Sequence, residues 1–183
     1  MADVQRAVEY VLREEDSTLS GAVTETRGDT GGKTRFGLAS KWHPELLATM
    51  FYTTMPTADA LQIAMTTLEK DFAAPLRIAE IQDPGIAVKF LSFGVNAGLQ
   101  TAVRAMQYAV NCVYPAASAD SASMQIRVDG AMGAETIAAV NRCMAQSLLN
   151  SFRLRMCGYY ASICRANVSQ REFLCGWIDR ALA

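Results

Sequence analysis

The hydrophobic positions near the start of the chain recur at the spacing of an α-helix. The apolar residues of this stretch are Val4, Ala7, Val8, Val11 and Leu12. Their spacing predicts an amphipathic helix over about residues 3 to 15. At about 100° per residue, Glu15 falls within about 20° of the middle of the apolar stripe, and Glu14 falls near its edge. We therefore expect this helix to end by directing the Glu15 carboxylate inward.

The segment that follows, residues 16–39, is rich in glycine, serine, threonine and charged residues. Its glycines permit tight turns, so we expect an irregular, exposed segment with at most a small β-hairpin near residues 17–37. An apolar stripe over residues 61–72 then returns to helical spacing. Asp83 and Pro84 have the form of an N-cap followed by proline at the first helical position, which predicts a helix to about residue 96.

Helical patterns also account for the remainder of the chain. One helix is expected to run to about residue 113, and residues 135–165 are helical in pattern, as one helix or two consecutive ones. A Ser-x-x-Glu capping box at Ser169 predicts the start of the last helix. Residues 114–124, rich in proline, alanine and serine, are expected to form a loop between residues 1–113 and 125–183, packed together as one compact unit. The fold class is therefore all-α.

The charge of the chain argues against one class of partner. Seventeen basic and eighteen acidic residues give a net charge of -1, so no overall basic field attracts nucleic acid. From residue 142 onward six arginines stand against two acidic residues, which is typical of solvated helix faces or of attraction to an anionic polymer such as a bacterial wall. We see no signal peptide and no run of about 18 apolar residues. We expect no membrane insertion, synthesis in the cytoplasm, and release or export by another factor.

The cysteines and the single histidine do not have the spacing of a metal site. The five cysteines are Cys112, Cys143, Cys157, Cys164 and Cys175. None forms a Cys-x-x-Cys pair, and His43 lies far away in sequence, so we expect no metal or other cofactor. Buried thiols acting as small hydrophobes are the simplest interpretation. A cysteine-dependent amidase with His43 as its base is an alternative, although His43 before Pro44 is typical of a surface loop.

Candidate chemistry lies in the acidic residues of the first segments. Hydrolysis of a glycosidic bond requires a protonated carboxyl group and a second group that handles water or attacks the sugar. Glu15, where the apolar face of the first helix ends, suits the first role. Asp29, in the glycine-rich segment, would orient water, which the Thr34 hydroxyl would help to hold. Asp29 has a structural alternative as a cap of the turn into Gly31 and Gly32.

Residues 29–38 resemble the Asp-x-Gly-Gly-x-Thr-x-x-Gly-Ile signature of glycoside hydrolase family 108, the N-acetylmuramidases of phage endolysins and secretion activator proteins. Residues 11–15 are similar to the helix that ends in the catalytic Glu of that family, which places it on Glu15. Further similar segments follow in order, at residues 93–98, 128–136, 159–160 and 173–180. The segment at 128–136 resembles part of a peptidoglycan-binding C-terminal region, which implies a catalytic region over 1–113 and a wall-binding region over 125–183.

The chain departs from the family pattern directly after Glu15. The family has Gly-Gly where this chain has Asp16 and Ser17, and the interval to the Asp-x-Gly-Gly motif is longer here by about five residues. A longer loop would displace Asp29 or bring in Asp16 or Glu25 as the second carboxylate. The resemblance therefore supports Glu15 more firmly than Asp29.

The resemblance implies a lysozyme-like fold with a cleft that binds peptidoglycan glycan strands and cleaves the bond after N-acetylmuramic acid. Aromatic and amide side chains suit such a cleft, and our candidates are Trp42, Asn96 and Tyr160. Trp177 is expected in the core. The implied protein is a monomer, with a holin, a secretion system or an immunity protein as further partners. The alternative to this muramidase is a non-catalytic wall-binding protein on the same fold.

Overall fold

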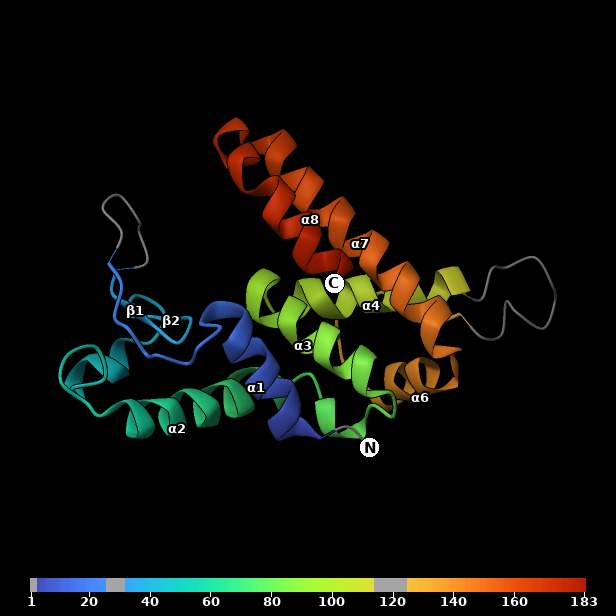
Figure 1. Ribbon diagram of the computed structural model, residues 1–183. Coiled ribbons are helices and arrows are strands. Elements are labelled where there is room, and N and C mark those ends of the chain that lie inside the picture. The colour runs from blue at the N-terminus through green and yellow to red at the C-terminus, as the bar shows by residue number, and fades with distance from the viewer. Residues whose placement is uncertain (1–2, 26–31, 114–124) are drawn as a thin grey trace.

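The computed structural model describes residues 3–25, 32–113 and 125–183 as an assembly of helices with one small hairpin (Figure 1). The elements are α1 (Val4–Glu15), β1 (Thr34–Arg35), β2 (Leu38–Ala39), η1 (Pro44–Ala48), α2 (Thr57–Leu68), η2 (Glu69–Ala73), η3 (Ile78–Glu80), α3 (Pro84–Ala97), α4 (Leu99–Val113), α6 (Ala134–Arg142), α7 (Ala145–Ala166), η4 (Val168–Phe173) and α8 (Leu174–Leu182). The predicted all-α class with a small hairpin is confirmed.

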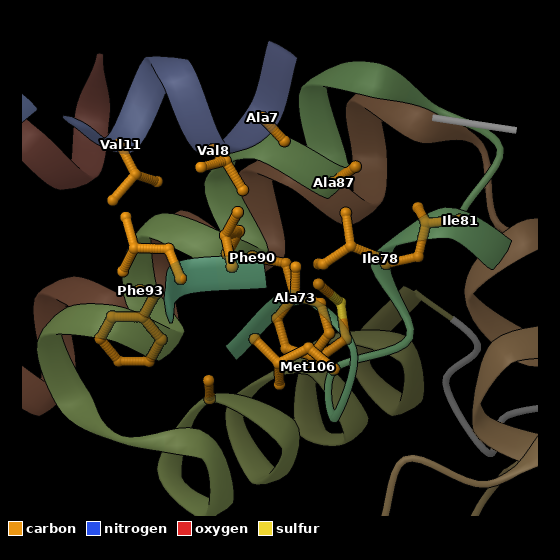
Figure 2. Close-up of a cluster of buried hydrophobic side chains, with 14 of the residues drawn as sticks. Ala7, Val8, Val11, Ala73, Ile78, Ile81, Ala87, Phe90, Phe93 and Met106 are labelled. Carbon is orange, nitrogen blue, oxygen red and sulfur yellow. The ribbon is translucent and has the colours of Figure 1, made fainter. Parts of the chain in front are cut away.

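Helix α1 forms where the apolar spacing predicts it. The Asp3 side chain caps its start by accepting a hydrogen bond from the Arg6 N–H at 3.2 Å. Its apolar stripe is buried, and Figure 2 shows Val8 and Val11 pointing toward Phe90 and Phe93 of α3. Burial of this stripe therefore fixes the direction in which the last turn of α1 presents its acidic residues.

Helix α3 is the central element of the fold. It packs against α1, α4 and α7, and its apolar residues face neighbours on several sides. The predicted cap is confirmed, because Asp83 accepts a hydrogen bond from the Ile86 N–H at 2.9 Å and Pro84 occupies the first turn. Lys89 lies within this buried helix with only 4% of its surface exposed.

The hairpin is short and lies slightly later than expected. Strands β1 and β2 are antiparallel, with Thr34 opposite Ala39, so the pairing extends two residues past the predicted end. The turn residues Phe36 and Gly37 have φ values of 51° and 78°, which is the left-handed pair that a type I′ turn requires. An isolated bridge joins Thr24 to Thr34 and attaches the preceding segment to the hairpin.

Arg35 anchors the hairpin to the body of the protein. Its side chain is 5% exposed. Its Nε donates to the Gly21 carbonyl at 2.8 Å, and Nη1 donates to the carbonyls of Phe51 at 2.8 Å and Met55 at 3.0 Å. One guanidinium therefore holds the segment before the hairpin and the segment before α2 in fixed positions.

The C-terminal helices form a pair that packs against the rest of the fold. Helix α7 contacts α3 and α4, and α8 folds back along α7 (Figure 1). The buried residues of α7 other than Cys164 join the same hydrophobic cluster as those of α1 and α3. The predicted helical stretch is divided between α6 and α7 at Cys143 and Met144. The division into two regions at 114–124 stays a prediction, since that segment lies outside the described residues.

Two details of the C-terminal part differ from expectation. The predicted capping box at Ser169 does not form, because Asn167 caps this turn instead and accepts a hydrogen bond from the Ser169 N–H at 3.1 Å. The 3₁₀ helix η4 then precedes α8. Cys164 is buried, whereas Cys112 and Cys175 are exposed, so the expectation of buried thiols is wrong for these two residues.

Candidate functional site

An open pocket lies where α1 ends beside the hairpin. Its volume is about 460 Å³, enough for part of a sugar chain rather than a large cofactor. The lining residues are Glu15, Asp16, Ser17, Ser20, Ala22, Thr24, Thr34, Phe36 and Gly37. Most of them carry hydroxyl or carboxylate oxygens, so the pocket suits a polar ligand rich in hydroxyl groups.

Glu15 projects into this pocket from the last turn of α1. Its side chain is 32% exposed, and Oε1 accepts a hydrogen bond and ion pair from Arg180 Nη1 at 3.2 Å. Oε2 receives no hydrogen bond from any described residue. A Cβ atom on Gly37 would lie only 2.8 Å from Glu15 Cγ, so the glycine of the hairpin turn is what allows the carboxylate to lie against the backbone there.

Glu14 points in a different direction from Glu15. It accepts a hydrogen bond from the Ser92 hydroxyl of α3 at 2.5 Å, and its charge and hydrogen bond contribute to a raised pKa of Tyr10, which burial raises most. Glu14 is also the less exposed of the two acids. The expectation of an inward Glu15 is thus modified: the core ends before the last turn of α1, so position 15 faces an open pocket rather than apolar packing.

Asp16 is a second carboxylate in the same pocket. Oδ1 accepts from the Thr18 hydroxyl at 3.1 Å, and Oδ2 accepts from the Ser20 hydroxyl at 2.9 Å and the Gly21 N–H at 2.8 Å. Desolvation of the carboxyl opposes ionisation, but these hydrogen bonds outweigh it and lower the pKa of Asp16 to about 2. Asp16 is therefore ionised across the neutral range.

Replacing Asp16 with alanine is expected to destabilise the protein by about 1 kcal/mol at pH 7, because three hydrogen bonds to a partly solvated carboxylate are lost. The folded-state pKa lies below the ordinary value of 3.8, so this stabilisation is present above about pH 4 and disappears as the pH falls toward 2. Urea unfolding of both proteins at pH 7 and pH 2 measures it. A difference that stays constant over this range would contradict the assignment.

The other predicted members of the catalytic set are placed only in part. Thr34 lines the pocket, and its backbone pairs with Thr24 through hydrogen bonds of 2.9 and 2.8 Å. Asp29 lies outside the described residues. Glu25 is exposed and does not line the pocket. The described carboxylates of this pocket are therefore Glu15 and Asp16.

The predicted sugar-binding residues are not gathered around Glu15. Trp42 is 71% exposed, with Lys41 Nζ 4.9 Å from its ring centroid, and it does not line the pocket. Asn96 accepts a hydrogen bond from the Tyr160 hydroxyl at 2.9 Å. Tyr160 itself is 1% exposed and stacks on Trp177 at 5.3 Å, and burial raises its pKa to about 12. The ring expected to stack on a sugar is covered here, because α8 packs over it.

Four residues of the site were not predicted from the sequence: Ser17, Ser20, Thr24 and Arg180. The three hydroxyl residues lie in the polar segment between Glu15 and the hairpin, so its composition carried the signal. Arg180 is separated from Glu15 by 165 residues, and only the excess of arginines near the C-terminus pointed to it. Their contact depends on α8 folding back along α7 toward the end of α1.

The described part of the chain offers neither a metal-binding cluster nor a membrane-spanning helix. No group of three or more His, Cys, Asp or Glu side chains there could hold a metal ion. Within the same residues, no helix is long and apolar enough to cross a membrane. His43, the other candidate catalyst, lies outside the pocket, with Nδ1 3.3 Å from a carboxylate oxygen of Glu45.

Comparison with known proteins places the chain in a cell-wall context. Residues 101–182 match a family described as "Predicted Peptidoglycan domain", which indicates a protein associated with peptidoglycan. No curated protein matches the sequence. Among solved structures, SagA of Brucella abortus is similar in fold, with a TM-score of 0.64, 19% sequence identity, and coverage of 98% of this chain and 93% of that one.

Proposed function

We propose that this protein is a peptidoglycan hydrolase, an N-acetylmuramidase of the glycoside hydrolase family 108 type. The observation that carries the proposal is the position of Glu15 in a polar pocket beside an ionised carboxylate, within a chain whose residues 101–182 match a peptidoglycan family. The resemblance of residues 29–38 to the family 108 signature supports the same reaction. On this resemblance, the substrate that binds in the pocket is a glycan strand.

In the proposed reaction, Glu15 donates a proton to the oxygen of the scissile glycosidic bond. Oε2 is the oxygen that substrate would reach, since Oε1 is paired with Arg180. Positive charge that develops on the sugar ring is stabilised by the ionised Asp16 carboxylate, which is held rigidly by its hydrogen bonds. Asp29 and the Thr34 hydroxyl remain our proposed groups for holding and activating the water.

Substrate contacts outside the pocket are also part of the proposal. Trp42 offers an exposed ring to a sugar face, and Asn96 offers an amide to an N-acetyl group. Tyr160 contributes indirectly, because its hydroxyl holds the Asn96 side chain. The protein would act on the cell wall after release through a holin or a secretion system, and an immunity protein would be its partner in the case of a toxin.

The second candidate function is wall binding without catalysis. The ion pair between Glu15 and Arg180 favours wall binding without catalysis, because one carboxylate oxygen of the proposed acid is bound to the Arg180 guanidinium. This alternative requires the same fold and the same match to a peptidoglycan family. The two functions therefore differ only in turnover.

Incubation of the purified protein with purified peptidoglycan tests the proposal. We expect release of reducing ends, with mass spectrometry locating the new end on N-acetylmuramic acid. Cosedimentation with the wall material without any new reducing ends would establish the binding protein instead. Release of free peptides from intact glycan would point to the cysteine-dependent amidase.

A further inference from the structure

The proposed acid has its described partner in another part of the chain. Glu15 ends α1, and its Oε1 lies 3.2 Å from the Nη1 atom of Arg180 in α8, 165 positions later. Both side chains are half-buried. The ion pair of Arg77 with Glu80, by contrast, joins residues of a single turn. The contact at Glu15 therefore forms only where α8 is packed against the N-terminal helices.

Two anchors fix the position of Arg180 on the body of the protein. Its carbonyl accepts a hydrogen bond of 2.9 Å from Nζ of Lys89 in α3, and the next residue, Ala181, is fully buried in the hydrophobic cluster. Helix α8 thus returns along α7 and reaches α3 (Figure 1). The end of α8 that carries the guanidinium is the end that is fastened to α3.

Lys89 is an unusual anchor because its side chain is buried. Burial lowers the pKa of Lys89, as do the nearby charges of Arg153 and Arg180, whereas the charge of Glu14 raises it. Removing an ammonium group from water costs free energy, and an apolar residue at this position of α3 would avoid that cost. What the lysine supplies in return is a fixed position for the Arg180 backbone.

The hairpin restrains the other side of the Glu15 side chain, but only near its base. A Cβ atom on Gly37 would lie 2.8 Å from Glu15 Cγ and 3.3 Å from Glu15 Cβ, so the turn packs against these two carbons. The carboxyl group beyond them turns about a bond whose torsion is broad and roughly two-fold. Among the described residues, Arg180 is the one that binds this group. The orientation of the carboxyl oxygens therefore depends on the guanidinium.

Orientation matters for a group that has to donate a proton to a bound substrate. A displacement of about 1 Å at a reacting group lowers a rate by about 100-fold. With Oε1 bound to Arg180, Oε2 is the oxygen that substrate would reach, and Arg180 does not itself line the pocket. Arg180 can therefore orient the acid without a contact of its own to the substrate.

We propose that Arg180 is a positioning residue, which holds the Glu15 carboxyl group so that Oε2 is presented to the glycosidic bond. The role of Glu15 as the acid rests on the proposed function, whereas the restraint on its side chain does not. Arg180 lies within residues 101–182, which match the peptidoglycan family. The matched stretch then completes the site at the end of α1, in contrast to the predicted division into a catalytic region and a wall-binding region.

The kinetics of reducing-end release from solubilised peptidoglycan test this role. Arg180→Met keeps the aliphatic part of the side chain and should lower kcat at least about tenfold, with KM changed by less than about threefold. Arg180→Lys keeps the charge and should retain at least about threefold more activity than Arg180→Met. Arg127→Met removes the same charge at an exposed position and should act like the unmodified protein. Equal loss in both Arg180 variants, a loss confined to KM, or an unchanged or raised kcat in Arg180→Met would overturn the proposal.

The restraint on Glu15 is measured by NMR without turnover. The order parameter of the Glu15 Cγ–H bonds should exceed about 0.8 in the unmodified protein and in Arg127→Met, and should fall below about 0.6 in folded Arg180→Met. A value that stays high in Arg180→Met would refute the positioning role. If the protein releases no reducing ends but the order parameter falls as expected, the proposed hydrolysis fails and the restraint is supported. If it releases them and the order parameter does not fall, the positioning role alone fails.

Discussion

Replacing Glu15 with glutamine is expected to abolish the release of reducing ends from peptidoglycan. Glutamine keeps the size of the side chain but cannot donate the carboxyl proton, and loss of a general acid lowers rates by about 100- to 10,000-fold. The side chain is 32% exposed and does not belong to the core, so the fold should remain intact. The loss of one surface ion pair with Arg180 should change stability by less than about 1 kcal/mol.

Glu14→Gln is the matched control, because it changes the neighbouring acid on the same helix turn. Glu14 faces Ser92 rather than the pocket, and the glutamine carbonyl can still accept the serine hydrogen bond. We expect this variant to release reducing ends at close to the unmodified rate. Loss of activity in Glu14→Gln alone would mean that the proton donor is Glu14, at the contact between α1 and α3. An equal loss in both folded variants would mean that neither side chain acts alone as the acid.

The sequence predicts those parts of the fold that depend on local interactions. The apolar stripe of α1 and the Asp83 cap of α3 both formed as expected, because each involves residues within a few positions of one another. The failure at Ser169 has the same origin: Asn167 offers a competing side-chain acceptor two residues earlier. The angular position of a residue on a helix, by contrast, does not indicate where the hydrophobic core ends along that helix. For this reason the sequence predicted the side of α1 on which Glu15 lies, but not that the side chain faces an open pocket there.

The long-range contacts at the site could not be predicted in the same way. The ion pair of Glu15 with Arg180 and the hydrogen bond of Asn96 with Tyr160 both depend on how α7 and α8 pack against the N-terminal helices. The periodicity of hydrophobic residues predicts each helix, but it does not predict which other helix packs against it. Tyr160 illustrates the consequence, since its residue type suits sugar stacking while α8 covers its ring. Its partner Asn96 is the member of that pair that remains exposed.

Arg180 connects the buried lysine of α3 to the pocket at Glu15 through its backbone and its side chain. Its carbonyl accepts the hydrogen bond of Lys89, and its guanidinium pairs with Glu15.

Replacing Arg35 with methionine is expected to have the largest effect on stability, about 3 to 5 kcal/mol. The guanidinium is buried and donates to three backbone carbonyls, those of Gly21, Phe51 and Met55. Methionine fills much of the volume of the side chain but leaves these carbonyls without donors, at about 1 to 3 kcal/mol for each that stays dry. The cation–π contact between the guanidinium and the Phe51 ring, in which Arg35 Cζ lies 5.8 Å from the ring centroid, is lost as well.

The effect of Arg35→Met should extend to the pocket, because Arg35 holds the segment at Gly21 against the hairpin that carries Thr34. Urea unfolding followed by circular dichroism measures the stability. Arg127→Met, at an exposed arginine, provides the control and should cost less than about 0.5 kcal/mol. A cost below about 1 kcal/mol for Arg35→Met would mean that water replaces the guanidinium at these carbonyls. Arg35→Lys should lie between the two, since one ammonium cannot reproduce the planar fork that reaches carbonyls on both sides.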